Sequence, residues 1–150
     1  MAGASSIALA GDADAEVAAA LTRKSPEAGR TIHTLSAGVL SGEEDWPGVD
    51  CTLVLAGLTG RSRPEVRTLL SAALGSSRSV VIVEPFTDEA EDDDHQAEEL
   101  VATLATTGNA SFTSGEVSRM LTELGAESVD VSPIGWGFGR FRSAVIAHGR

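Results

Sequence analysis

The chain has 150 residues, of which 42% are hydrophobic and 22% are charged, and its formal net charge at pH 7 is -11. A chain of this length buries roughly two-thirds of its unfolded surface in one core and is too short for two ordinary cores. We therefore expect residues 1–150 to form a single domain. The negative charge disfavours nucleic acid and anionic membranes as partners, because both would present like charges to it.

Composition also bears on the cellular compartment. No apolar run in the sequence reaches the roughly 18 residues that a membrane span needs. The first ten residues lack the basic start and the long apolar run of a secretory signal. The single cysteine, Cys51, cannot form an internal disulfide, and its apolar neighbours favour a buried thiol over a nucleophile. These features predict a cytoplasmic protein.

The first third of the chain predicts a strand, a helix and a second strand. Residues 7–10 form a short apolar run, and residues 15–24 have the apolar spacing of a helix. Residues 31–35 are rich in β-forming side chains. Residues 36–49 have the composition of a turn, so we expect a loop there with at most one helical turn.

The middle of the chain predicts two buried strands around a helix. Residues 50–58 are almost continuously apolar, which is typical of a strand buried on both faces of a parallel sheet. Charged residues 61–67 open a helix with Pro64 in its first turn, and Gly75 lies where it ends. Residues 80–83 form the next buried strand.

The last third predicts two helices and a pair of strands. Residues 98–106 are amphipathic, and residues 114–124 predict a helix that ends at Gly125. Residues 129–131 are expected to pair with residues 143–147. The alternation of strands and helices predicts an α/β domain with a parallel sheet, helices on both of its faces and an antiparallel hairpin at one edge.

Three segments together resemble a known family. They are Ser79–Ala90 (SVVIVEPFTDEA), Thr107–Ala126 (TGNASFTSGEVSRMLTELGA) and a closing strand in residues 141–148. Their order is similar to the last part of bacterial natural-product O-methyltransferases that use S-adenosylmethionine. The resemblance implies a single Rossmann-like, methyltransferase-type sheet, mostly parallel, with a C-terminal antiparallel hairpin and a shortened N-terminal half. The family's N-terminal helical dimerisation domain has no counterpart in the sequence.

The resemblance also identifies the positions where the family binds its cofactor. The family has several glycines after its first strand, whereas this chain has Gly11 followed by Asp12. The family ends its second strand with an acid that binds the ribose hydroxyls, and Thr34 occupies that position. The adenine-binding strand has no clear counterpart in residues 36–49. We therefore expect these positions to be vestigial and expect no S-adenosylmethionine to bind.

The family's catalytic positions are largely replaced. The family has a general base in a His-Asp-Trp sequence, where this chain has Thr59, Gly60 and Arg61. One orienting acid of the family matches Glu84, and a second is missing near Ser111. A threonine hydroxyl has no pKa near neutrality, so it cannot act as the base. We expect no catalytic residue, with Glu84 as a weak candidate.

Other features of the sequence favour surface roles. The acidic run of residues 88–95 lacks the ligand spacing of a calcium loop and is interpreted as a solvated linker. His33 and His148 lack partners at metal-binding spacing, so no metal site is expected. Exposed aromatic side chains are typical of protein interfaces. The interface candidates are Trp46, Trp136, Phe138 and Phe141.

Two main hypotheses about function follow from these observations. The first is a catalytically silent, methyltransferase-like subunit that binds a larger companion enzyme, such as a full-length methyltransferase of a natural-product pathway. The second is a small active enzyme of the same fold, either an S-adenosylmethionine-dependent O-methyltransferase or a repurposed cyclase or isomerase, in which Glu84 is the acid or base. A free-standing ligand-binding module is a third, and self-association through a sheet edge at residues 31–35 is a further expectation.

Overall fold

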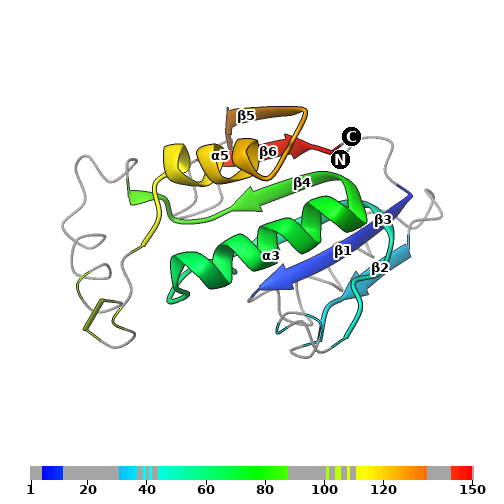
Figure 1. Ribbon diagram of the computed structural model, residues 1–150, viewed down its shortest axis with the longest axis horizontal. Coiled ribbons are helices and arrows are strands. Elements are labelled where there is room, and N and C mark those ends of the chain that lie inside the picture. The colour runs from blue at the N-terminus through cyan, green and yellow to red at the C-terminus, as the bar shows by residue number, and fades with distance from the viewer. Residues whose placement is uncertain are drawn as a thin grey trace.

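The computed structural model describes residues 5–11, 31–36, 39, 41, 44–87, 101, 104–105, 108, 111–134 and 143–149. These residues form one sheet of six strands and the two helices that cover it (Figure 1). In chain order the elements are β1 (Ser6–Gly11), β2 (Thr31–Thr34), β3 (Val49–Leu55), α3 (Arg63–Ser76), β4 (Ser77–Val83), α5 (Ser114–Glu123), β5 (Ser128–Pro133) and β6 (Ser143–His148).

The sheet is parallel except at its C-terminal side. Its strand order is β2-β1-β3-β4-β6-β5. The pairs β1–β2, β1–β3 and β3–β4 are parallel, whereas β6 is antiparallel to both β4 and β5. Val129 lies opposite Ala147, as expected for the hairpin. The predicted α/β sheet, mostly parallel and closed by an antiparallel pair at one edge, is confirmed.

Both described helices pack on the same face of the sheet (Figure 1). Residues of α3 and α5 join strand side chains such as Val54, Ile82 and Val145 in one buried cluster. A second, smaller cluster, which includes Leu9, Cys51 and Val81, lies on the other side of the strands. Cys51 is buried, as predicted. The helix predicted for residues 15–24 lies outside the described residues, and so does most of the one predicted for residues 98–106.

Capping explains where the two helices begin. The Thr113 hydroxyl accepts a hydrogen bond from the backbone N–H of Glu116 at 3.0 Å, and the Glu116 carboxyl group accepts one from the Thr113 N–H at 3.0 Å. At the start of α3, the Glu65 carboxyl group accepts hydrogen bonds from the N–H and hydroxyl of Ser62, each at 2.7 Å. Such reciprocal caps satisfy N–H groups that have no partner within the helix.

Strand β3 is shorter than predicted. The apolar run continues to Leu58, but the strand ends at Leu55. The next residue, Ala56, has a positive φ of 47°, which turns the chain out of the extended conformation. The apolar side chains of residues 56 and 58 are nevertheless buried. Continuous hydrophobicity therefore marks burial here, and only the backbone turn separates the strand from the loop that follows it.

The hydroxyl group of Thr52 is an energetic weakness of the core. Thr52 is fully buried in β3, two residues before Val54 and on the same face as it, beneath α3. Among the described residues its hydroxyl oxygen has no hydrogen-bond partner. A buried hydroxyl without a partner loses its bonds to water and gains nothing in return.

We predict that Thr52→Val stabilises the protein by about 1 kcal/mol, because valine has nearly the same shape and no group to desolvate. Urea-induced unfolding followed by circular dichroism measures the change. Thr68→Val is the matched control on the exposed side of α3, where the hydroxyl donates to the Pro64 carbonyl at 3.1 Å. A Thr52→Val variant that is less stable than the native chain would show that the hydroxyl has a partner in solution.

Asp50 ties the start of β1 to β3 at the amino ends of the strands. Its Oδ2 accepts hydrogen bonds from the hydroxyl and N–H groups of Ser5, at 2.6 and 3.0 Å, and from those of Ser6, at 3.2 and 3.1 Å. These bonds favour the ionised carboxyl group and lower its pKa from 3.8 to about 2, the Ser5 hydroxyl having the largest effect. The contact therefore stabilises the fold only when Asp50 is charged.

This pKa shift predicts a pH dependence of stability. Because the pKa of Asp50 is lower in the folded chain, its contribution is fully present above about pH 4 and is lost as the pH falls through about 2. Asp50→Asn should therefore flatten the fall in the thermal unfolding midpoint between pH 4 and pH 2. Asp45→Asn, which removes an exposed carboxyl group, is the control. Equal slopes for the native chain and Asp50→Asn would contradict the prediction.

Candidate functional site

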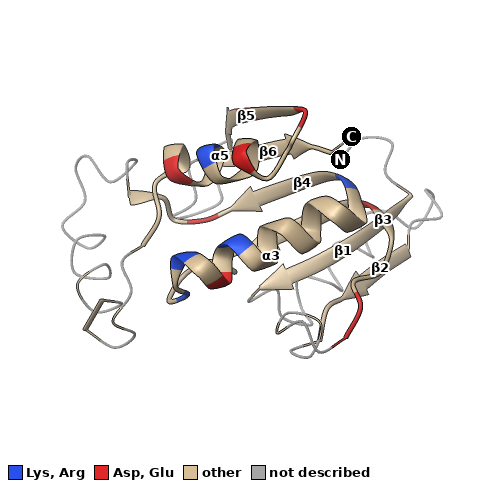
Figure 2. Cartoon of the chain, in the orientation of Figure 1, with Lys and Arg blue, Asp and Glu red and all other residues tan. Residues whose placement is uncertain are grey.

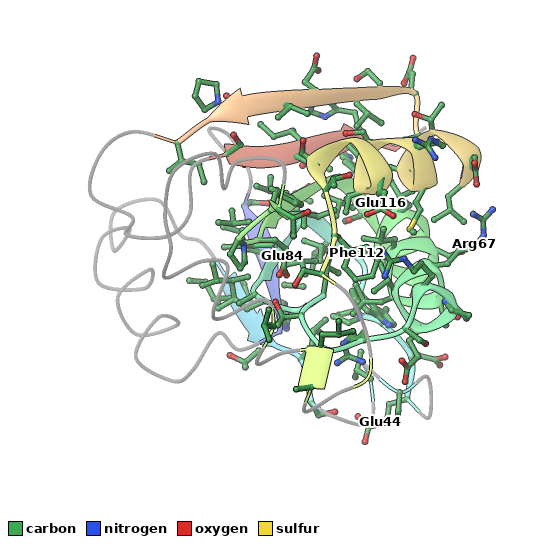
Figure 3. All side chains as sticks on the ribbon, turned by 90° about the vertical axis from the view of Figure 1, so that its left-hand side faces the viewer. Glu44, Arg67, Glu84, Phe112 and Glu116 are labelled. Atoms are coloured by element: carbon green, nitrogen blue, oxygen red, sulfur yellow. The ribbon has the colours of Figure 1, made fainter. Side chains whose placement is uncertain are left out.

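The carboxyl ends of the parallel strands β1 to β4 lie along the same edge of the sheet. Ligands of open α/β sheets bind beyond this edge, where the loops after the strands meet. Figure 3 views the molecule from the side to which β1 and β4 point in Figure 1, with Glu84 near the middle of that view. The sequence places Gly11, Thr34 and Glu84 at the ends of three of these strands.

The turns after β1 and β3 touch through their backbones. Gly11 has a φ of 99°, and a Cβ atom built on it would lie 2.4 Å from the Leu55 carbonyl oxygen and 2.7 Å from the Cα of Gly57. A Cβ on Gly57 would lie 2.8 Å from a methyl group of Val54. Both glycines are therefore required by packing within the chain. The space that Gly11 leaves open is filled by protein atoms.

Glu84 is the polar centre of this edge. It follows β4 directly, and only 3% of it is exposed. Its Oε1 accepts a hydrogen bond from the backbone N–H of Leu58 at 2.7 Å, and its Oε2 accepts one from the Thr59 hydroxyl at 3.1 Å. The carboxyl group thus joins the loop after β3 to the end of β4. A buried polar group bonded in this way has a structural role even without a ligand.

Thr59, the residue that the sequence resemblance placed at the general-base position, is hydrogen-bonded within the protein. Thr59 is exposed, but its hydroxyl proton is directed to Glu84. Two residues further on, the Arg61 Nε donates to the carbonyl oxygen of Gly57 at 2.8 Å. Thr59 and Glu84, which the sequence resemblance matched to the base and the orienting acid, therefore bind each other and hold the loop. Sequence comparison identified both positions, but not the hydrogen bond between them.

The end of β2 offers a neutral side chain where the family has an acid. Thr34 is exposed and lies next to Leu9 of β1 in the parallel register. A hydroxyl group cannot replace a carboxylate that accepts hydrogen bonds from two ribose hydroxyls. Asp12 lies outside the described residues. At the end of β2, Thr34 itself offers no carboxylate for a ribose, and the nearby carboxyl group of Glu44 accepts a hydrogen bond from the Ser36 hydroxyl at 2.9 Å.

One of the four predicted interface aromatics can be placed. Trp46 is partly buried and packs against the large core cluster. It also lines a hollow of about 560 Å³ against α3, together with side chains such as Val39 and Leu69. Its ring is therefore shared between the core and the surface. The other candidates, Trp136, Phe138 and Phe141, lie outside the described residues, and the interface role of all four stays a prediction.

Sequence analysis missed a cluster beside this edge that joins α3 to α5. The Arg63 guanidinium lies 4.5 Å from the ring centre of the buried Phe112 and forms a 3.0 Å ion pair with Glu116. Arg67 forms a second pair with Glu123 at 2.7 Å. Figure 2 shows basic and acidic positions on both α3 and α5. The sequence signal that could have predicted these ion pairs is two arginines spaced four residues apart on one predicted helix and two glutamates on a later one. The side chains hold the two helices together.

Two other classes of function leave no sign in the described part of the chain. It contains no group of three histidine, cysteine or acidic side chains that could hold a metal ion. No described helix is both long enough and apolar enough to cross a membrane.

Comparison with known proteins identifies the fold. No protein-family model and no curated protein matches the sequence. Among solved structures, PigF with S-adenosylhomocysteine superposes with a TM-score of 0.77 at 13% identity, over 98% of this chain and 51% of that chain. The ligand-free S-adenosylmethionine-dependent methyltransferase SibL superposes with a TM-score of 0.73 at 21% identity, over 99% of this chain and 51% of that chain. Human N-acetylserotonin methyltransferase with S-adenosylmethionine superposes with a TM-score of 0.76 at 12% identity, over 97% of this chain and 48% of that chain.

These similarities establish the architecture. The chain has the fold of about half of an S-adenosylmethionine-dependent O-methyltransferase, and it spans about half the length of the solved structures that it matches. The methyltransferase-type α/β fold implied by the sequence resemblance is thus confirmed. At these identities the likeness concerns the fold alone.

The structural role of Glu84 can be tested by substitution. Glu84→Ala should destabilise the protein by about 1–3 kcal/mol, because the Leu58 N–H is left buried without its acceptor. Glu84→Gln keeps an acceptor for that N–H and should cost less. Urea unfolding of the two variants beside the native chain measures both effects. Equal stability of Glu84→Ala and the native chain would show that the carboxyl group does not hold the loop.

Proposed function

We propose that this chain is a catalytically silent, methyltransferase-like subunit that binds and supports a companion enzyme, such as a full-length methyltransferase of a natural-product pathway. The hydrogen bond between Thr59 and Glu84 carries the proposal. In an active enzyme of this kind the two positions would hold a base and its orienting acid. In this chain they form a hydrogen bond that needs no substrate.

Cofactor binding is unfavourable for reasons that are independent of the base. S-adenosylmethionine supplies a methyl group on a sulfonium centre, and its nucleoside must be held for that chemistry to occur. Thr34 offers no carboxylate for the ribose. The backbone of Leu55 and Gly57 occupies the space beside Gly11. These two positions, Thr34 and Gly11, thus offer little to hold the nucleoside.

Retention of the fold without its chemistry favours a role for the surface. Side chains of both described helices and of β1, β3, β4 and β6 remain packed in the large core cluster. A protein whose function is to bind another protein needs this rigid framework and does not need a ligand site. The net charge of -11 favours a companion with a neutral or basic contact surface.

Calorimetric titration tests the loss of cofactor binding. S-adenosylmethionine or S-adenosylhomocysteine is added to the purified chain up to about 1 mM, and we expect no heat of binding from either. A matched methyltransferase of the same fold is the positive control. Saturable binding with a dissociation constant of about 10 μM or less would contradict the proposal and favour the active-enzyme hypothesis.

The companion is tested separately. The tagged chain, expressed in its native host, should co-purify with one larger enzyme in a one-to-one complex that mass spectrometry identifies. Added back to that enzyme after separate purification, the chain should raise its activity or its thermal unfolding midpoint. A captured enzyme that is unchanged in both measurements would contradict the supporting role.

A further inference from the structure

The edge strand β2 is unusually open to pairing with another strand. It lies at the end of the sheet, on the right in Figure 1. Three of its four residues are exposed, and it contains neither a charged residue nor a proline. Proteins commonly protect edge strands with such residues. The opposite edge, β5, is protected in this way by Asp130 and Pro133.

The outward side of β2 carries a defined set of backbone groups. The N–H groups of Thr31 and Leu35 donate to the carbonyl oxygens of Ser5 and Leu9, each at 2.9 Å, so these residues face β1. Because the direction alternates along a strand, the N–H and C=O groups of Ile32 and Thr34 face away from β1. Within the described structure, no strand pairs with that side of β2.

We propose that two copies of this chain associate through their β2 strands, paired antiparallel about a two-fold axis at His33. In this register Ile32 lies opposite the partner's Thr34, and each residue of the pair donates its N–H to the carbonyl oxygen of the other. The symmetry-related pair does the same, so the outward groups of both strands form four hydrogen bonds. His33 lies opposite the partner's His33 in the non-hydrogen-bonded pair between them.

Symmetry favours a second copy as the occupant. Ile32 and Thr34, which carry the outward N–H and C=O groups, lie one residue before and one residue after His33. The same strand in a second copy, turned by 180°, therefore presents matching donors and acceptors, as a two-fold interface requires. One acidic side chain, that of Glu44, lies close to the end of β2. The Glu44 carboxyl group accepts a hydrogen bond from the Ser36 hydroxyl at 2.9 Å, just after β2 ends. Antiparallel pairing places the Glu44 residues of the two copies at opposite ends of the joined strands.

The net charge sets the strength of this association. Each copy carries -11, so the two repel at long range. Added salt screens this repulsion beyond about 10 Å and leaves the backbone hydrogen bonds intact. The dimer is therefore expected to become tighter as the salt concentration rises. This inference is independent of the companion enzyme, since it involves only copies of this chain.

Disulfide trapping tests the register at single-residue resolution. In the paired strands, the two Cα atoms at position 33 are about 4.5 Å apart, which allows a disulfide. His33→Cys should therefore form a covalent dimer under mild oxidation. Thr31→Cys is the matched control, because its two copies are separated by more than about 12 Å along the strands. Cys51 is buried and present in both variants. Equal cross-linking of both variants, or of neither, would overturn the proposal.

Sedimentation equilibrium with backbone variants provides an independent measurement. Ile32→Pro deletes an outward N–H without removing a bond to β1, so it should weaken dimerisation at least tenfold. Ile32→Val keeps that N–H and should dimerise like the native chain. Circular dichroism establishes that each variant is folded, and should Ile32→Pro fail to fold, the disulfide result decides. A native chain that stays monomeric at about 0.5 M salt and about 1 mM protein would overturn the proposal.

Discussion

The buried carboxyl group of Glu84 constrains the whole carboxyl edge of the sheet. It bonds to the backbone of Leu58 and the hydroxyl of Thr59, and so determines how the chain leaves β3 before α3 begins. The Ala56 N–H donates to the Val83 carbonyl oxygen at 2.9 Å and holds the same loop from the other side. With this loop in place, Gly57 lies in close backbone contact with Gly11 at the end of β1. The Glu84 carboxyl group and the glycines Gly11 and Gly57 are thus engaged in contacts within the chain.

The hydrophobic core lies on both faces of the sheet. Buried strand side chains alternate between a large cluster under α3 and α5 and a smaller one on the other face. Most of these contacts lie away from the carboxyl edge, although Leu58 and Phe86 belong to the large cluster and lie beside Glu84 at that edge. The superposition on methyltransferase structures at 12–21% identity concerns this shared framework.

Electrostatics and hydrogen bonding act on different parts of the surface. The excess of negative charge acts over a long range and disfavours acidic partners. Short-range contacts are determined by local groups, such as the neutral edge strand β2 and the arginines that pair α3 with α5. An acidic protein can therefore still form specific contacts where its surface is locally neutral. This distinction explains why net charge excludes classes of partner but does not identify one.

The sequence by itself determined the order of the elements and the class of the sheet. Apolar runs such as residues 50–58 and 80–83, and helix starts such as Pro64, are local signals that need no knowledge of distant residues. The resemblance also drew attention to Thr59 and Glu84 as a pair of positions. It could not show that they bind each other, since they are 25 residues apart and meet only because β3 and β4 are adjacent. The end of β3 at Leu55, the contact of Gly11 with Gly57 and the outward groups of β2 likewise depend on which strands lie side by side. Tertiary structure alone decided these features, because each arises from contacts between segments that are distant in the chain.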